Sequence, residues 1–191
     1  MEQTLYTVTV YSENQVGLLN QVTIVFTRRQ VNIESLTVSR SAIPGIHKFT
    51  ITAYTDQDTI AKVVRQIERR IDVLKAYYYT DDEVIFQEVA LYKVPTDSLL
   101  DNSAVEQMVR RYNARILEVN RNYTVIELTG HQQEIQSLYE DLEPAGILQF
   151  VRSGRIAITK STVERLSDFL KEMEERRRIE GLPSAGEYET L

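Results

Sequence analysis

Apolar and polar residues follow two different periods along the first part of the chain. Between Leu5 and Tyr11 they alternate, with Thr7 and Thr9 on the polar side, which is typical of a strand with one buried face. After Leu18 the apolar residues instead recur with the three-to-four spacing of an amphipathic helix. The predicted elements are a strand at Leu5–Tyr11, a helix from Leu18 to about Arg28, strands at Val31–Arg40 and Phe49–Ala53 around a Pro44-Gly45 turn, a helix after the capping residues Asp56 and Asp58 whose apolar face runs from Ile60 to Ile71, and a strand at Val73–Tyr79. This order is βαββαβ.

The same order starts again after Asp81-Asp82-Glu83. Its predicted elements are a strand at Val84–Val94, a helix with Val105, Met108, Val109 and Tyr112 on one face, a hairpin of Arg115–Val119 and Tyr123–Leu128, a helix at Gln132–Leu142, and a strand at Ile147–Val151. The chain is therefore predicted to be an α+β protein with two ferredoxin-like βαββαβ domains, at residues 1–80 and 81–160. A capping pattern at Ser161 and Glu164 predicts a further helix, so residues 161–191 form a helical extension with a flexible tail.

Composition limits the chemistry. The chain has 191 residues, a net charge of −6, no cysteine, and two histidines, His47 and His131, without an acidic partner pattern. Disulfides, thiolate metal sites and cysteine nucleophiles are excluded, and we predict no catalytic and no metal-binding residue. The acidic balance argues against nucleic acid. No apolar run reaches the roughly 18 residues of a membrane helix, and no leader-like segment opens the chain, so we expect a cytoplasmic protein.

The most informative loop lies between the first strand and the first helix and consists of Asn14, Gln15, Val16 and Gly17, followed by Leu18. Gly17 falls in the opening turn of the helix, where a missing side chain lets a ligand approach the unpaired backbone amides. These amides and the helix dipole favour an anion such as the carboxylate of an amino acid. The alternative is structural: Asn14 caps the turn, and Gly17 eases the chain into the helix.

A second segment, Val31-Asn32-Ile33-Glu34-Ser35-Leu36-Thr37-Val38, changes the weight of these alternatives. Asn-Ile-Glu-Ser-Leu-Thr-Val, one helix after an Asn-x-x-Gly-x-Leu loop, resembles the ACT domain of acetolactate synthase regulatory subunits. The resemblance returns at Ile71-Asp72-Val73-Leu74 and at Ser153-Gly154-Arg155, and it covers nearly all of residues 4–160. It implies a homodimer whose ACT-domain sheets join edge to edge, with valine bound at the seam. The Asn14–Leu18 loop of one chain then holds the polar end of valine, and Asn32 and Ile33 of the other chain close the site.

The resemblance also implies a function. The chain would have no enzyme activity of its own. It would activate a separate catalytic subunit of acetolactate synthase, which holds thiamine diphosphate, FAD and Mg²⁺, and it would confer feedback inhibition by a branched-chain amino acid. Three alternatives are an RNA binder, which lacks a basic and aromatic strand motif here, a free-standing enzyme, for which no nucleophile-base pair or phosphate loop is present, and an amino-acid sensor that regulates a different partner.

Overall fold

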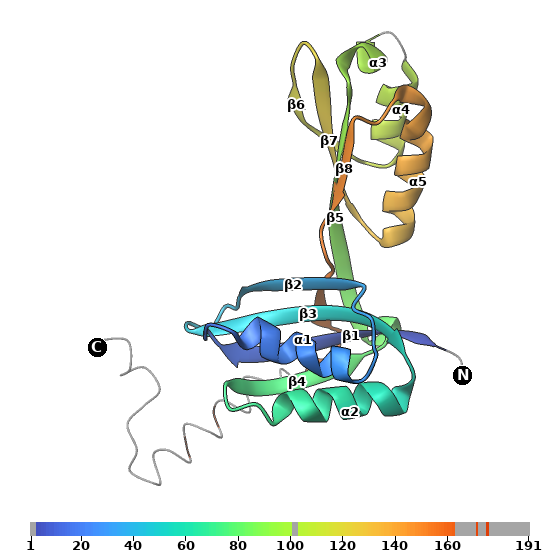
Figure 1. The fold of residues 1–191 in the computed structure, drawn as a ribbon. Coiled ribbons are helices and arrows are strands. Elements are labelled where there is room, and N and C mark those ends of the chain that lie inside the picture. The colour runs from blue at the N-terminus through green and yellow to red at the C-terminus, as the bar shows by residue number, and fades with distance from the viewer. Residues whose placement is uncertain (1–2, 101–102, 163–170, 172–174, 176–191) are drawn as a thin grey trace. The chain divides into compact units, whose positions relative to one another are not determined.

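The first part of the chain folds into a four-stranded antiparallel sheet, called here the first sheet, with α1 and α2 on one face (Figure 1). The computed structural model describes residues 3–100, 103–162, 171 and 175. The strand order is β2-β3-β1-β4, as a βαββαβ unit of ferredoxin-like topology requires. The elements are β1 (Thr4–Glu13), α1 (Leu18–Arg28), β2 (Ser35–Arg40), β3 (Ile46–Thr55), α2 (Gln57–Glu68) and β4 (Val73–Tyr79).

Both helices are placed by their sequence patterns. In the apolar stripe of α1, Val22 and Phe26 are completely buried against the sheet, whereas Leu19 at its start is 47% exposed. Asp56 caps α2 as predicted, because its carboxylate accepts hydrogen bonds from the Thr59 amide at 2.9 Å and the Thr59 hydroxyl at 2.8 Å. The predicted stripe of α2 was one turn too long: the helix ends at Glu68, and Ile71 lies in the following turn, fully exposed.

The predicted strand at Val31–Arg40 was also too long, because the first four residues connect the helix to the sheet. The Val31 amide donates to the Phe26 carbonyl at 3.1 Å and so closes the end of α1. Gln30, just before it, has a φ of 55°, which turns the chain. Pairing with β3 begins only where the Glu34 amide donates to the Thr52 carbonyl at 2.8 Å. Asn32 and Ile33 therefore lie in the connection and not in the strand.

The second part of the chain repeats this topology in the second sheet, with the order β6-β7-β5-β8 and β9 paired to β5. The prediction of two ferredoxin-like units is thus confirmed, whereas α3 and β9 were not predicted. The elements are the 3₁₀ turn η1 (Asp81–Glu83), β5 (Val84–Pro95), α3 (Thr96–Leu100), α4 (Ser103–Arg111), β6 (Arg115–Val119), β7 (Tyr123–Gly130), α5 (Gln132–Leu142), the 3₁₀ turn η2 (Glu143–Ala145), β8 (Gln149–Arg152) and β9 (Ile156–Thr159).

The core of the second sheet contains one large polar side chain. Tyr92 is fully buried, and its hydroxyl donates to the Ile135 carbonyl at 2.7 Å, which satisfies the phenol. Burial raises the pKa of Tyr92, because the phenolate would be poorly solvated there. Phe150 packs beside it, with 5.1 Å between the ring centroids. The residue therefore acts as a neutral core side chain.

The face of the first sheet opposite its helices, called here the polar face, is buried around Thr7 and Thr9. The alternation predicted that Thr7 and Thr9 would face water, but Thr7 is completely buried and Thr9 nearly so. The segment after β8 covers them: Arg155 donates to Thr7, and Lys48 from β3 donates to the Ala157 carbonyl at 2.5 Å. Burial lowers the pKa of Lys48. The polar face is thus the inner side of a second layer.

Of the predicted helix from Ser161, the structure describes Ser161 and Thr162, which are not helical, and Lys171 and Glu175, which are. The rest of it and the tail after Gly181 lie outside the described residues. Within the described part of the chain, no helix is long and apolar enough to span a membrane.

Candidate functional site

The loop between β1 and α1 is held by its backbone, and its side chains point to solvent. The Glu13 amide donates to the Asp72 carbonyl at 2.9 Å, which anchors the start of the loop to the turn before β4. The Gln15 amide donates back to the Glu13 carbonyl at 3.1 Å, and the Leu18 amide donates to the Gln15 carbonyl at 3.3 Å. Asn14, Gln15 and Val16 are exposed. The loop is therefore ordered, with open side-chain positions.

Gly17 starts α1 with an uncapped end. It is the N-cap residue, and its φ of +86° is a left-handed conformation that favours glycine. A Cβ at this position would meet nothing within 4 Å, so the backbone conformation, and not crowding by the protein, requires glycine here.

The first turn of α1 leaves donors available. It carries no acidic residue and no side-chain cap, and the first helical hydrogen bond runs from the Gln21 amide to the Gly17 carbonyl at 3.1 Å. The amides of Leu19 and Asn20 make no hydrogen bond to any described residue. Free amides and an unneutralised helix dipole at an open glycine suit a carboxylate ligand. Sequence inspection located the loop but not these two donors, because only the backbone geometry identifies them.

Asn32 and Ile33 lie at the other end of the same sheet. Ser35, the first residue of β2, is paired with Thr52, and Thr52 is also paired with Thr7 of β1. The β1–α1 loop follows Glu13, which is six strand positions further along β1, or roughly 20 Å at the usual rise per residue. Within one chain, the two predicted parts of the site therefore do not meet.

The predicted residues also differ in what they offer to a ligand. The Asn32 amide group donates to the Glu34 carboxylate at 3.0 Å and is otherwise exposed. Ile33 is half-buried against the hydrophobic core of the first sheet. Leu18 is 2% exposed, so its side chain belongs to the core and only its backbone faces the loop.

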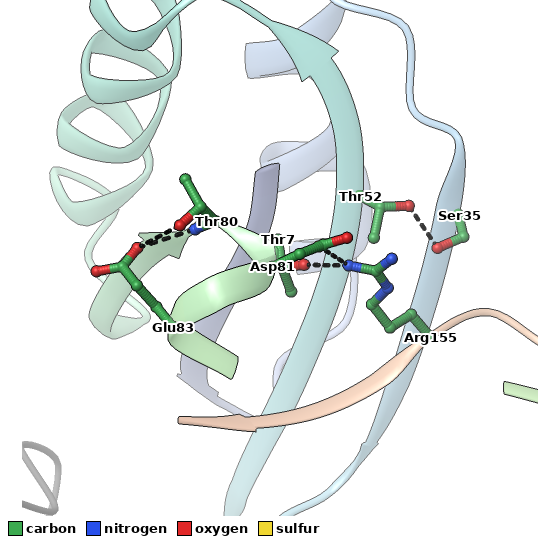
Figure 2. A network of polar contacts seen from close by, with 7 residues as sticks. All are labelled: Thr7, Ser35, Thr52, Thr80, Asp81, Glu83 and Arg155. Atoms are coloured by element: carbon green, nitrogen blue, oxygen red, sulfur yellow. Dashed lines mark hydrogen bonds and ion pairs between the residues drawn. The ribbon is translucent and has the colours of Figure 1, made fainter. Parts of the chain in front are cut away.

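A second cluster, on the polar face, was not predicted to be a cluster (Figure 2). Arg155 is 3% exposed, and its Nη1 donates to the Thr7 hydroxyl at 2.9 Å and to the Asp81 carboxylate at 2.6 Å. The guanidinium stacks on Phe86, with 3.6 Å between its central carbon and the ring centroid. The cluster ties the segment after β8 to β1, the strand that carries the loop.

Gly154 allows this close approach. A Cβ built there would collide with the Thr37 hydroxyl and would lie 3.3 Å from the Leu36 carbonyl oxygen. The Ser153-Gly154-Arg155 motif was the available sequence signal, but nothing in the local pattern indicated that it packs on the polar face.

The first sheet and its two helices have the arrangement of an ACT domain. Residues 8–75 match the family model described as the AHAS small subunit-like ACT domain. Residues 87–161 match the model described as the small subunit of acetolactate synthase. The chain belongs to the family of acetolactate synthase small subunits.

Individual relatives agree with the family models. The acetolactate synthase small subunit of Bacillus subtilis is 29% identical over 161 residues, which cover 84% of this chain and 93% of the relative. The probable acetolactate synthase small subunit of Methanothermobacter thermautotrophicus is 30% identical over 162 residues, with 85% and 96% covered. The crystal structure of the acetolactate synthase small subunit from Thermotoga maritima matches with a TM-score of 0.75 and 27% identity, and covers 83% of this chain and 99% of that chain.

Proposed function

We propose that this chain activates a catalytic acetolactate synthase subunit and confers feedback inhibition by valine, bound between two copies of the ACT domain. The observation that carries the proposal is the open start of α1 at Gly17, where the Leu19 and Asn20 amides have no hydrogen-bond partner among the described residues. These donors suit the carboxylate of an amino acid.

Strand register supports a site shared by two chains. β2 is an edge strand of the first sheet, and an unpaired edge can pair with a second copy. Antiparallel pairing of two β2 strands about their midpoint, between Thr37 and Val38, would set Ser35 of the second copy opposite Arg40. Arg40 is paired with His47, which is also paired with Ser12, next to the β1–α1 loop.

Two-fold pairing would therefore bring together the β1–α1 loop and the Asn32-Ile33 segment, which lie apart within one chain. Asn32 and Ile33 of the second copy precede its Ser35, so they would extend past Arg40 to the level of Asn14 and Gln15. The polar end of valine would meet the Leu19 and Asn20 amides, and its isopropyl group would face Ile33. Since each site then needs both chains, effector binding and dimerisation are thermodynamically linked.

The expected affinity is modest. Burial of an isopropyl group contributes about 2 kcal/mol, and two or three hydrogen bonds to charged groups contribute about 1.5–3 kcal/mol each. After an association cost of several kcal/mol, this corresponds to a Kd on the order of 10–100 μM. That range suits a feedback sensor.

The remaining assignments extend the same proposal. Residues 1–80 act as the effector-binding and dimerising domain, residues 81–160 as the second domain, and residues 161–191 as an extension. The chain works in the cytoplasm and contributes no cofactor, while the catalytic partner holds thiamine diphosphate, FAD and Mg²⁺.

The test is reconstitution of the catalytic subunit with this chain and titration with valine, leucine and isoleucine. Gly17→Asp should abolish valine inhibition and largely retain activation, because a carboxylate beside the free amides occupies the place of the ligand's carboxylate and repels it. Gly17→Asn is the matched control, since asparagine has the same shape, also tolerates a left-handed φ, and has no charge. An unchanged inhibition curve for Gly17→Asp would place the effector elsewhere, and acetolactate formation by this chain alone would contradict the regulatory role.

A further inference from the structure

A groove of about 650 Å³ on the helix side of the first sheet is lined by six cationic side chains. They come from the end of α1 and from α2 with the turn after it, and together with one glutamine they form what we call the basic groove. Its members are Arg28, Arg29, Lys62, Arg65, Gln66, Arg69 and Arg70. Among the residues that the structure describes, no carboxylate lines it, although the whole chain carries a net charge of −6. The groove therefore concentrates positive charge on an acidic protein.

Within the described residues, the protein does not neutralise these charges. None of the six forms an ion pair there, and only Arg29 makes a side-chain hydrogen bond, from its Nε to Gln66 at 3.2 Å. The Nε of Arg70 is buried without a hydrogen-bond partner. Buried polar groups normally have a hydrogen-bond partner, so this nitrogen indicates that the groove lacks a hydrogen-bond acceptor.

Helix electrostatics explain only part of the cluster. Cations near a helix C-terminus are stabilised by about 0.3–1 kcal/mol each, which accounts for Arg28 and Arg65 in the last turns of their helices. Lys62, however, lies in the middle of α2, and its spacing to Arg65, like that of Arg65 to Arg69, brings like charges together. An anion in the groove would relieve this repulsion.

We propose that the basic groove binds a small polyanion that carries linked phosphate groups. Arginine guanidiniums match phosphate oxygens in a two-pronged geometry, and five of the six cations are arginines. No aromatic or aliphatic residue of the described part of the chain lines the groove, so these residues offer neither a stacking surface for a base nor the apolar core of a protein interface. The recognised chemistry is thus the phosphate chain itself.

The test is calorimetric titration of the full chain with sodium tripolyphosphate, inorganic phosphate and a nucleoside triphosphate. Tripolyphosphate should bind at least about tenfold more tightly than phosphate, since it spans several cations at once. The nucleoside triphosphate should match tripolyphosphate, because nothing in the groove contacts a base. A nucleoside triphosphate that binds much more tightly, or a phosphate that binds as well as tripolyphosphate, would overturn the proposal.

Variants locate the site. Arg65→Glu with Arg69→Glu should weaken tripolyphosphate by about ten- to a hundredfold, as expected for two lost charge-assisted contacts. Arg121→Glu with Lys160→Glu makes the same change in net charge at exposed positions outside the groove and should leave the affinity within about twofold. Equal loss in both pairs would mean attraction by overall charge and would overturn the site. Arg65→Ala with Arg69→Ala, checked for a native thermal transition, repeats the test without added repulsion, and unchanged binding there would also refute it.

Discussion

The two sheets share one topology but bury opposite members of their arginine-carboxylate pairs. On the first sheet, Arg155 is the buried partner, and the Asp81 side chain is 47% exposed. On the second sheet, Glu127 is the buried partner, and the Arg115 side chain that covers it is 74% exposed. The difference follows from what covers each sheet on the side away from its helices.

A chain segment covers the polar face of the first sheet, whereas the corresponding face of the second sheet is more exposed among the described residues. In the first case, Arg155 must be held by fixed contacts with Thr7, Asp81 and Phe86, because water is excluded. In the second case, Val89 and Leu91 of β5 remain more than a third exposed, and the flexible Arg115 side chain stays hydrated. On β1 the covered face carries the buried Thr7 and Thr9, whereas on β5 the more exposed face carries Val89 and Leu91.

The largest expected effect comes from Arg155→Met. The variant should lose about 2–3 kcal/mol of unfolding free energy, because the buried Thr7 hydroxyl loses its partner while Asp81 can rehydrate. Arg115→Met is the matched change on the second sheet and should cost at most about 1 kcal/mol, since Thr129 still donates to Glu127. Urea unfolding measures both. Equal losses would show that burial of the cation does not distinguish the two sheets.

Gly154→Ala is expected to have the next largest effect, about 1–3 kcal/mol, because its Cβ collides with Thr37 and approaches the Leu36 carbonyl. Gly146→Ala separates crowding from backbone strain: its Cβ meets nothing within 4 Å, but its φ is +84°. That control should lose only about 1 kcal/mol. If Gly154→Ala unfolds at the same thermal midpoint as the wild type, the segment that contains Gly154 does not pack tightly against β2.

The smallest effect concerns pH. The Thr129 hydroxyl, and then Arg115, hold the pKa of Glu127 below its usual range against the opposing effect of burial. A lowered pKa in the folded state adds stability that is present above the unfolded value of about 4.3 and is lost as pH falls through the folded pKa. The advantage of the wild type over Glu127→Gln should therefore shrink between pH 6 and about pH 3. Urea midpoints that keep the same difference at both pH values would contradict this assignment.

Local patterns predicted the elements well where one period dominates. The stripe of α1, the Asp56 cap and the repeated βαββαβ order all depend on contacts close in sequence, and the structure has them. The burial of Thr7 and Thr9 could not be predicted in this way, because it depends on a segment about 150 positions away. A threonine that meets water and one that meets a distant strand give the same alternation.

The candidate site shows the same limit. The loop and the Asn32-Ile33 segment were identified from sequence, mostly through family resemblance, but their separation along the sheet depends on strand register. Val31–Glu34 looked like strand because Val31 and Ile33 are β-branched, and this local preference was overridden by the closing turn of α1. The two amide donors at Leu19 and Asn20 carry no side-chain signal at all.

The most direct test of the shared effector site is complementation in mixed dimers. Gly17→Asp and Asn32→Ala chains should each bind valine weakly as homodimers, the latter by about 1–3 kcal/mol less than the wild type. A mixed dimer pairs one Gly17→Asp chain with one Asn32→Ala chain. If each site is shared between the chains, one site carries both substitutions and the other carries neither. Calorimetry should then measure wild-type affinity at half of the sites. If each site were built from a single chain, every site would keep one lesion, and no recovery in the mixed dimer would contradict the account.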